Sequence, residues 1–461
     1  MTTARLRGRC CGGSGIRLEL QDVARVIVSS GGVAGEVSGF SIDSRTVEAG
    51  DLFFALRGEH SDGHQYLAQA FERGAAAAII DRDIEAPGET LRVVDTLIAL
   101  QELARWARQK WGKKVVGVTG SAGKTSTKDV IAALLAASMH VGKTVGNFNN
   151  HIGLPLSILR LADEAEVAVL EMGMNHAGEI RDLCVIARPD IGVVTNVGTA
   201  HIESFDSVEG IALAKKELID ALPEGGGIAV LNNDDEHVRH FNDAHQGEAI
   251  TFGIGEGADI RAEDVELLET GVRFRVGKAI FSSSLMGRHG ILNILAGIAV
   301  ADAFGIQASQ LEDAIRSLTP GKMRGERLTH NGITIFNDCY NSNPDAARAM
   351  LEVLRETTGA SHIAVLGEML ELGRWSEPLH RDVGRYAAEY GISVLVGIRG
   401  AAQSMIDAAM EAGLAKDAAY FFEDPIDAGA LVRKIARAGD VILFKGSRGT
   451  RVERALEEFL K

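Results

Sequence analysis

The sequence is poor in the features that mark secreted, metal-binding and membrane proteins. Its four cysteines lie at positions 10, 11, 184 and 339, and no pair of them has the spacing of a metal site. Four cysteines are too few for a disulfide scaffold, and their scarcity favours a reducing compartment. We therefore expect a cytoplasmic protein. No apolar run is long enough to span a bilayer, and the basic N-terminal segment lacks the apolar core of a signal peptide. We therefore expect no membrane insertion.

Positive charge is also scarce. The chain has 48 Lys and Arg residues against 63 Asp and Glu residues, which gives a formal net charge of −15. A surface that binds a nucleic-acid backbone needs clustered lysine and arginine, so we expect no nucleic-acid partner. What the sequence does have is 46% hydrophobic and 24% charged residues, which is ordinary for a globular protein with large cores. Its length of 461 residues indicates about three domains.

Hydrophobic patterns divide the chain into a leader and three α/β blocks. Residues 1–16 are predicted to be a disordered leader. Residues 17–112 contain short strands and helices and end in the long amphipathic helix LIALQELARWARQKWG. In residues 113–320 fully apolar strands alternate with helices, which predicts a parallel sheet covered on both faces. Residues 321–461 show the same alternation and predict a second doubly wound, Rossmann-like unit.

A short glycine-rich segment, VVGVTGSAGKTSTKDV, joins an apolar strand to a helix that we expect to begin at Thr125. Gly120 and Gly123 allow backbone N–H groups to converge on an oxyanion, and the helix N-terminus adds partial positive charge. Lys124 is placed to reach the β- and γ-phosphates of a nucleotide, and the Thr125 hydroxyl can ligate Mg²⁺. The match is shorter than usual, because Val118 stands where the full pattern GxxxxGK[ST] has glycine. The strand before it and the helix after it favour a P-loop site for a nucleoside triphosphate over a chance turn.

This loop alone does not identify a reaction. Motors, switch GTPases, kinases and ligases share it, but the NKxD element of a guanine-specific switch is absent from the sequence. A nucleotide-dependent regulator without enzymatic activity stays open as an alternative at this point. The predicted nucleotide contacts of the loop are Gly120, Ser121, Ala122, Gly123, Lys124, Thr125 and Ser126.

Chemically active side chains follow two later strands of the second block. Ligands of a parallel sheet bind beyond the carboxyl ends of its strands, so we expect Glu171 and His201 on adjacent strand ends beside the loop. Glu171 offers the carboxylate oxygen that Mg²⁺ prefers. Lys215, in the next helix, allows two interpretations: a solvated lysine beside Lys216, or a lysine carbamylated by CO₂ that ligates metal as an anion. The residues alone favour the first.

Several segments then point to a known family. The loop TGSAGKTSTK is followed by GNFNNHIGLPLSIL and LEMGMNHAGEI in the second block, and by DCYNSNPDA, VLGEMLELG and KGSRGTRVE in the third. Together with SIDSRTVEAGDLFFALRG in the first block, these segments resemble the Mur ligase family over nearly the whole chain after about residue 17. The resemblance implies an ATP-dependent ligase that adds amino acids or peptides to a UDP-linked cell-wall precursor.

The resemblance also implies a substrate and a division of labour. The continuation STK and the absence of a DNPR element favour the branch that joins D-alanyl-D-alanine to UDP-N-acetylmuramoyl-tripeptide through an acyl phosphate. A sibling ligase that adds a single amino acid is the alternative. The family further implies a first domain that binds the uridine nucleotide, a second that binds ATP, a C-terminal ligase domain, two Mg²⁺ ions and a monomer.

Individual residues take roles from the same resemblance. Four positions depart from the family pattern: Gly290 replaces a common asparagine, Lys216 a common glycine, Ser342 a usual alanine and Cys339 a usual serine. The implied catalytic residues are Lys124, Glu171, His201 and Lys215. The implied metal ligands are Thr125, Glu171, His201 and Lys215, the last in its carbamylated form. The remaining implied contacts are Asn293, Arg324, Asp338, Tyr340 and Asn343 for the nucleotide, and Ser44, Arg45, Asn149 and Asn150 for the substrate.

Overall fold

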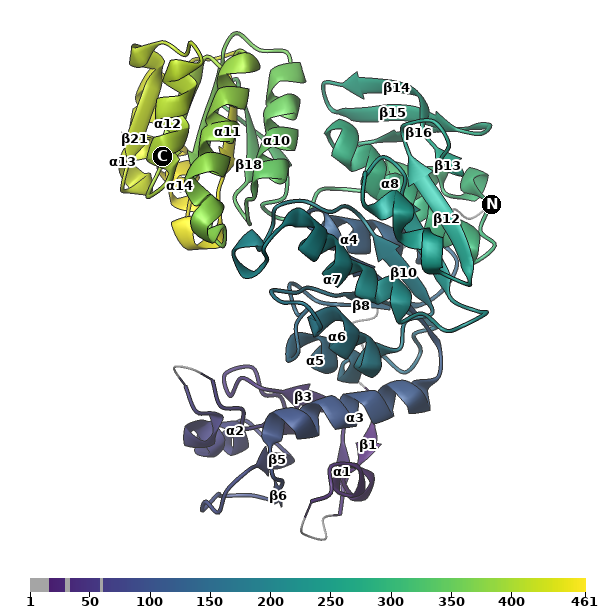
Figure 1. The fold of residues 1–461 in the computed structure, drawn as a ribbon. Helices are drawn as coiled ribbons and strands as arrows, with labels where there is room; N and C mark the ends of the chain where they lie inside the picture. Colours follow the sequence, from purple (N-terminus) through teal and green to yellow (C-terminus); the bar gives the residue numbers. More distant parts are fainter. Residues whose placement is uncertain (1–15, 30–33, 59–60) are drawn as a thin grey trace, which may run out of the picture.

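The computed structural model describes residues 16–29, 34–58 and 61–461, which form three α/β domains in chain order. Figure 1 shows the N-terminal domain at the bottom, the central domain above it and the C-terminal domain at the upper left. In these ranges no helix combines the length and the apolar character needed to cross a bilayer. Most of the predicted leader, with Cys10 and Cys11, lies outside the described residues. The prediction is wrong for Ile16, whose side chain is buried in a hydrophobic core.

The N-terminal domain has a small parallel sheet and one long helix. Its strands are β1 (Leu18–Glu19), β2 (Glu36–Val37), β3 (Gly39–Ser41), β4 (Asp51–Phe54), β5 (Ala77–Ile80) and β6 (Thr90–Arg92). Its helices are α1 (Leu20–Val26), α2 (Leu67–Glu72) and α3 (Thr96–Trp111). The parallel order is β3-β4-β5-β6, and β1 pairs with β2 in the antiparallel sense. Asp95 caps α3, because its carboxylate accepts hydrogen bonds from the N–H groups of Leu97 and Ile98.

The central domain has a fully parallel sheet that carries the glycine-rich loop. Its strands are β7 (Lys114–Thr119), β8 (Val141–Lys143), β9 (Val167–Glu171), β10 (Ile191–Val194), β11 (Ile228–Asn232), β12 (Glu248–Gly253) and β13 (Ile260–Arg261). Its helices are α4 (Lys124–Leu135), α5 (Gly153–Leu159), α6 (Glu179–Ala187), α7 (Val208–Asp220), α8 (Gly287–Ala303) and α9 (Glu312–Arg316). The strand order is β13-β12-β11-β10-β7-β9-β8, so β7 lies between β9 and β10.

Two hydrophobic cores cover the faces of this sheet. One core joins its strands to α4 and α8, and the other joins them to α5, α6 and α7. Covered on both faces, the strands have the continuous apolar runs that the sequence shows. A separate antiparallel sheet precedes α8. It consists of β14 (Glu263–Leu268), β15 (Gly271–Val276) and β16 (Ala279–Ser283).

The C-terminal domain is a second doubly wound unit. Its strands are β17 (Glu326–His330), β18 (Ile333–Asp338), β19 (His362–Gly367), β20 (Val394–Ile398), β21 (Ala419–Phe422) and β22 (Val441–Lys445). Its helices are α10 (Pro344–Glu356), α11 (Ser376–Glu389), α12 (Ala402–Glu411), α13 (Pro425–Ile435) and α14 (Glu453–Phe459). The order is β17-β18-β22-β19-β20-β21, and every pair is parallel except β17 with β18. The polar, half-exposed edge strand β17 has no apolar run, so the sequence pattern did not indicate it.

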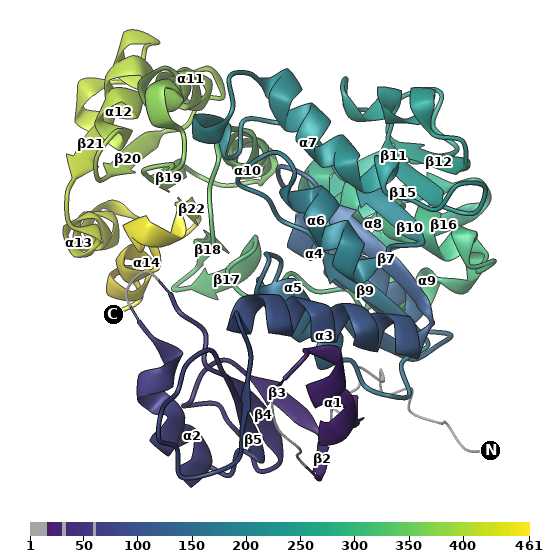
Figure 2. The same cartoon turned by 60° about the horizontal axis from the view of Figure 1, so that its bottom comes forward.

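The central domain meets its two neighbours in different ways. Helix α3 lies between the N-terminal sheet and α5 and α6 of the central domain, as Figure 2 shows. Arg160 strengthens this junction, since its Nε donates a hydrogen bond of 2.9 Å to the Phe40 carbonyl in β3. On the other side, α10 of the C-terminal domain packs against α8, and the loops beside α10 approach the glycine-rich loop. The candidate site lies at this second junction.

Candidate active site

The glycine-rich loop has a backbone that requires glycine at two positions. Gly120 has a φ of +151°, and a Cβ atom there would lie 1.9 Å from the Thr195 hydroxyl oxygen. Gly123 has a φ of +79° and directly precedes α4, which begins at Lys124, one residue before the predicted start. One glycine therefore permits a close approach of two segments, and the other permits a left-handed turn into the helix.

The segment after β10 holds the loop in shape. The N–H of Ser121 donates to the backbone carbonyl of Asn196 at 3.0 Å, and the N–H of Ala122 donates to the side-chain oxygen of Asn196 at 2.7 Å. Because these donors are used inside the protein, the N–H groups in the first turn of α4 are the ones left for an anion. Lys124 reaches back over the loop and donates to the Gly120 carbonyl at 2.7 Å. Burial lowers the pKa of Lys124.

The loop forms one wall of a cavity of about 630 Å³ between the central and C-terminal domains. The structure brings most of the predicted residues together around it, although they come from segments far apart in the sequence. The predicted residues that line the cavity are Ser121, Ala122, Gly123, Lys124, Thr125, Ser126, Asn149, Asn150, Glu171, His201, Asn293, Arg324, Asp338, Tyr340 and Asn343. The predicted residues outside its lining are Ser44, Arg45, Gly120 and Lys215.

Glu171 ends β9 with its carboxylate inside the protein, where the side chain is 2% exposed. Its Oε1 accepts a hydrogen bond of 2.8 Å from the Asn149 amide, whereas its Oε2 is buried without a partner. An unpaired buried carboxylate oxygen is costly unless a ligand completes it. Asn150, next to Asn149, instead accepts hydrogen bonds from the N–H groups of Ile152 and Gly153 just before and at the start of α5.

The cavity fits a magnesium ion that is held partly by a nucleotide. Among the described residues no group of three or more His, Cys, Asp and Glu side chains could hold a metal by itself. Mg²⁺ in phosphate-transfer sites takes one or two protein oxygens together with phosphate and water. The unpaired Glu171 Oε2 and the Thr125 hydroxyl oxygen, both in this cavity, are protein oxygens that suit Mg²⁺ as ligands.

The two neighbouring lysines of α7 have different environments. Lys215 is 1% exposed and makes no hydrogen bond or ion pair with any described residue. Burial, and secondarily the charge of Lys124, lowers the pKa of Lys215 well below its usual value. Lys216 is half-buried and pairs with Asp220. The prediction of a solvated Lys215 is therefore wrong. Lys215 lies four residues after Ile211, on the buried face of α7.

His201 approaches the cavity from the loop after β10, but its strand is not the neighbour that we predicted. Glu171 and His201 do not follow adjacent strands, because β7 lies between β9 and β10. They face one another across the end of β7, which places them on either side of the glycine-rich loop. The Nδ1 atom of His201 lies 2.6 Å from the Glu371 carboxylate of the C-terminal domain. Sequence patterns gave no indication of this pair.

The C-terminal domain closes the cavity with polar and aromatic groups. The Arg324 guanidinium lies over the Tyr340 ring, 3.8 Å from its centroid. Asn343 caps α10 through its side-chain oxygen, and its amide nitrogen lies 3.4 Å from the Ser121 carbonyl of the loop. Asp338, at the end of β18, forms a 2.6 Å ion pair with Lys445 at the end of β22.

Several residues in the lining were not predicted. Lys445 is buried and also donates to the Asn341 carbonyl at 3.0 Å. Asp345 accepts a hydrogen bond of 3.0 Å from the Thr199 N–H of the central domain. His289 lies in the cavity wall, and burial lowers its pKa. Lys445 could have been found by applying the strand-end rule to the last strand of the third block.

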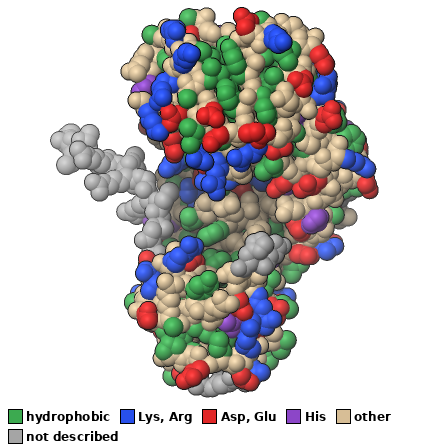
Figure 3. Space-filling model, turned by 90° about the vertical axis from the view of Figure 1, so that its left-hand side faces the viewer, with side chains coloured by type: hydrophobic (Ala, Val, Ile, Leu, Met, Phe, Trp, Pro, Cys, Tyr) green, Lys and Arg blue, Asp and Glu red, His purple; other side chains and the backbone are tan. Residues whose placement is uncertain are grey.

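The predicted uridine-nucleotide residues lie elsewhere, at the carboxyl-end edge of the N-terminal sheet. Ser44 donates to the Gln69 side chain at 2.6 Å, and Arg45 pairs with Asp43. Figure 3 shows the molecule hollowed between the N-terminal domain below and the C-terminal domain above. These two predicted residues therefore occupy a region separate from the cavity.

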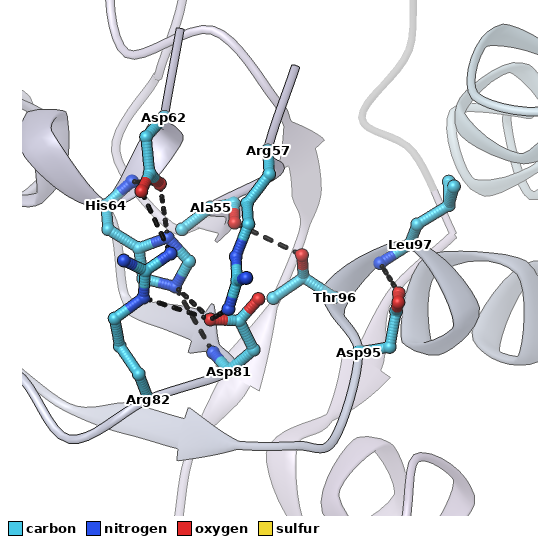
Figure 4. Close-up of polar contacts among 9 residues, drawn as sticks. All are labelled: Ala55, Arg57, Asp62, His64, Asp81, Arg82, Asp95, Thr96 and Leu97. Carbon is cyan, nitrogen blue, oxygen red and sulfur yellow. Dashed lines mark hydrogen bonds and ion pairs between the residues drawn. The ribbon is translucent and has the colours of Figure 1, made fainter. Parts of the chain in front are cut away.

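A charged network occupies the same edge of the N-terminal sheet. In Figure 4 the buried His64 ring lies between Asp62 and Asp81, with Arg57 and Arg82 against the Asp81 carboxylate. His64 Nδ1 lies 2.6 Å from Asp62, and its Nε2 accepts the Asp81 N–H at 3.2 Å, so Nδ1 carries the proton. In this network the side chains of Arg57 and Arg82 are about half exposed to solvent near the carboxyl ends of the strands.

Comparison with known proteins identifies the family. Three family descriptions match the chain: "Mur ligase family, catalytic domain" over residues 36–110, "Mur ligase middle domain" over residues 118–301 and "Mur ligase, glutamate ligase domain" over residues 323–448. A relative from Bacillus subtilis (strain 168), named UDP-N-acetylmuramoyl-tripeptide–D-alanyl-D-alanine ligase, is 38% identical over 92% of this chain and 93% of its own length.

Solved structures agree with this assignment. A crystal structure of MurF from Acinetobacter baumannii has a TM-score of 0.89 and 29% identity, and the match covers 97% of this chain and 100% of that one. MurF ligase from Thermotoga maritima, solved in complex with ADP, has a TM-score of 0.82 and 32% identity, with 91% and 96% covered. These matches confirm the predicted three-domain α/β fold, and the chain belongs to the Mur ligase family.

Proposed function

We propose that the chain is an ATP-dependent ligase of peptidoglycan synthesis that joins D-alanyl-D-alanine to UDP-N-acetylmuramoyl-tripeptide. One observation carries this proposal: the phosphate loop, the unpaired oxygen of Glu171 and polar groups of the C-terminal domain face one cavity. The activity named for the B. subtilis relative supports the substrate assignment. As the family resemblance implies, the enzyme acts as a monomer in the cytoplasm.

The chemistry begins with activation of the tripeptide. In water a carboxylate does not condense with an amine, so its oxygen first attacks the γ-phosphorus of ATP, and ADP leaves. The amine of the dipeptide then attacks the acyl phosphate, and the tetrahedral intermediate expels inorganic phosphate to leave an amide. The Lys124 ammonium and the first-turn N–H groups of α4 stabilise the charge that develops on the transferred phosphoryl group. Closure of the two domains around the cavity excludes water from the acyl phosphate.

Mg²⁺ would supply the charge neutralisation that lets the triphosphate approach a carboxylate. Glu171 and Thr125 are the residues that suit one ion. Lys215 in carbamylated form, with His201, suits a second. A neutral amine is the form of lysine that reacts with CO₂, and burial shifts the pKa of Lys215 toward that form.

Exposed arginines at two sheet edges suit the anionic ends of the other substrates. Arg57 and Arg82, at the edge that also holds Ser44, provide cations for the diphosphate of the uridine nucleotide. In the C-terminal domain, Arg399 follows β20 and Arg448 follows β22, at the edge where an open α/β sheet binds ligands. Their guanidinium groups suit the carboxylate of the incoming dipeptide.

A substrate panel tests this function. Phosphate release and product mass are measured with ATP, UDP-N-acetylmuramoyl-tripeptide and, in turn, D-alanyl-D-alanine, D-alanine, L-lysine or meso-diaminopimelate. We expect full phosphate release only with the dipeptide, and a product heavier by one dipeptide residue unit. Addition of a single amino acid would assign the chain to the sibling ligase. Failure of every amine to stimulate phosphate release would favour a regulator and contradict the proposal.

A further inference from the structure

We propose that Glu371 of the C-terminal domain is a positioning residue for His201. It holds the imidazole so that Nε2 faces the cavity, and this makes the second metal site depend on docking of the C-terminal domain. The inference rests on the proposed function, because it assumes that His201 binds a metal ion beside the nucleotide. It adds a carboxylate from another domain to the group of residues that build the site.

The contact is direct and crosses the domain junction. His201 Nδ1 lies 2.6 Å from Glu371 Oε2. His201 belongs to the lining of the cavity, whereas Glu371 does not. The half-exposed carboxylate therefore contacts Nδ1 of a histidine that lines the cavity, and Nε2 is the ring nitrogen left for a ligand.

The chemistry of imidazole assigns the roles of the two nitrogens. A carboxylate is an acceptor, so Nδ1 of His201 carries the proton that Glu371 binds. The other nitrogen, Nε2, then has a free lone pair, which is the form that a metal ion requires. Carboxylates in this position behind metal-binding histidines fix the tautomer and the ring orientation, and they raise the basicity of the ligand.

The backbone on both sides of the contact is well anchored. His201 has a φ of +63° and Glu371 a φ of +64°, and each lies in a short turn. The Glu371 carbonyl also lies 3.4 Å from the Glu203 N–H, so one residue contacts the same turn twice. Leu372, the next residue, is 1% exposed. Two fixed turns joined at two points suit a contact that orients a ring.

A second ion pair at the same junction allows the positioning of His201 to be tested separately from the contact between the two domains. Arg374 lies 3.9 Å from the Asp206 carboxylate, and both side chains are exposed. Neither residue lines the cavity. Arg374→Ala therefore removes a domain contact only three residues from Glu371 and leaves the environment of His201 unchanged, which makes it a matched control.

The experiment counts bound Mn²⁺ by electron paramagnetic resonance, with the full chain and a non-hydrolysable ATP analogue. We expect two Mn²⁺ ions in the parent protein and a roughly 10- to 100-fold loss of affinity for one of them in Glu371→Ala. Arg374→Ala should bind both ions as the parent protein does. Glu371→Gln, which keeps a hydrogen-bond acceptor, should recover most of the loss. In turnover, Glu371→Ala should raise the Mg²⁺ concentration needed for half-maximal rate, with kcat near that of the parent protein at saturating Mg²⁺.

Three results would overturn the inference: a parent protein that binds one Mn²⁺, unchanged binding in Glu371→Ala, or an equal loss in Arg374→Ala. Melting curves show whether each variant is folded, and Glu371→Leu, which has similar volume and no acceptor, provides the test with the same expected loss if the alanine variant is not. Failure of the proposed function is a distinct result. It would appear as absence of dipeptide ligation by the parent protein, whereas this inference fails on metal affinity in a protein that ligates.

Discussion

Both junctions of the central domain bury basic side chains. These side chains differ in how many hydrogen-bond and ion-pair partners the protein gives them. At the N-terminal junction, Arg108 of α3 is 6% exposed and fully engaged. Its Nε donates to the Ala187 carbonyl at 2.7 Å, its Nη2 donates to the Arg188 carbonyl at 3.0 Å, and Asp190 lies 3.3 Å away. Burial lowers the pKa of Arg108, and the charge of Asp190 opposes that shift.

At the catalytic junction two lysines have few protein partners, whereas the buried Lys445 pairs with Asp338. Lys124 donates to one carbonyl of its own loop, and Lys215 has no hydrogen bond or ion pair within the part of the chain that the structure describes. A buried cation without partners reduces stability, whereas one with acceptors all around it joins two domains. The difference teaches that Lys124 and Lys215, which belong to the proposed site, are left largely without protein partners, whereas Arg108, which joins two domains, is paired.

The largest effect that we expect separates the two lysines of α7. Lys215→Ala should lower the ligation rate about 1000-fold, because it removes the anion that would complete the metal site. Acetate or propionate should restore part of the rate by placing a carboxylate in the vacated space. Lys216→Ala, the matched control, should keep more than about half of the rate, since an exposed pair contributes little. Full activity of Lys215→Ala in a phosphate-release assay would remove the carbamate proposal.

The second prediction tests the contacts of Arg108 at the N-terminal junction. Arg108→Leu should lower the free energy of unfolding by about 3 kcal/mol, because it leaves the buried Ala187 carbonyl without its guanidinium donor and removes a hydrogen bond each from the Arg188 carbonyl and Asp190. Urea denaturation followed by circular dichroism measures this change. Arg105→Leu on the same helix breaks only an exposed pair with Glu102 and should cost less than about 1 kcal/mol. Equal losses in the two variants would contradict the conclusion that the buried contacts of Arg108 join the two domains.

The smallest effect concerns pH. Because the pKa of Lys215 is lowered from 10.5 in the folded protein, the unfolded chain holds a proton that the folded chain has released throughout the window between the two values. The free energy of unfolding should therefore rise with pH in this window, by at most about 1.4 kcal/mol per pH unit for one proton. Lys215→Met should reduce this slope in metal-free, CO₂-free buffer at pH values below 10.5. An identical slope in both proteins would indicate that Lys215 is not desolvated.

Local patterns predicted the fold well where one stretch of chain carries the information. The apolar strands, the glycine turn and the helix after it are local properties, and the structure matches them to within one residue at Lys124. The strand order is not local, so the prediction that β9 and β10 are adjacent was wrong. The polar edge strand β17 was missed because its residues are half exposed and follow no apolar period.

The site was predicted to the extent that motifs name its residues. Segments quoted from the sequence contain most of the cavity lining, including Lys124 and Glu171, and the strand-end rule added His201. No motif indicated that Glu371 pairs with His201, since the partners are 170 residues apart and belong to different domains. Lys445 was within reach of the strand-end rule, but its pairing with Asp338 depends on β22 lying beside β18.

By itself, the sequence determined the α/β class, the phosphate loop and the family, because each depends on residues that are close together in the chain. Only the tertiary structure decided which of Lys215 and Lys216 is buried, since successive residues of a helix point about 100° apart and packing selects one of them. It also decided which side chains share the cavity. The order of residues in the chain determines which side chains are close along the backbone. Which side chains become buried or paired depends on segments that are distant in the chain and pack together, excluding water.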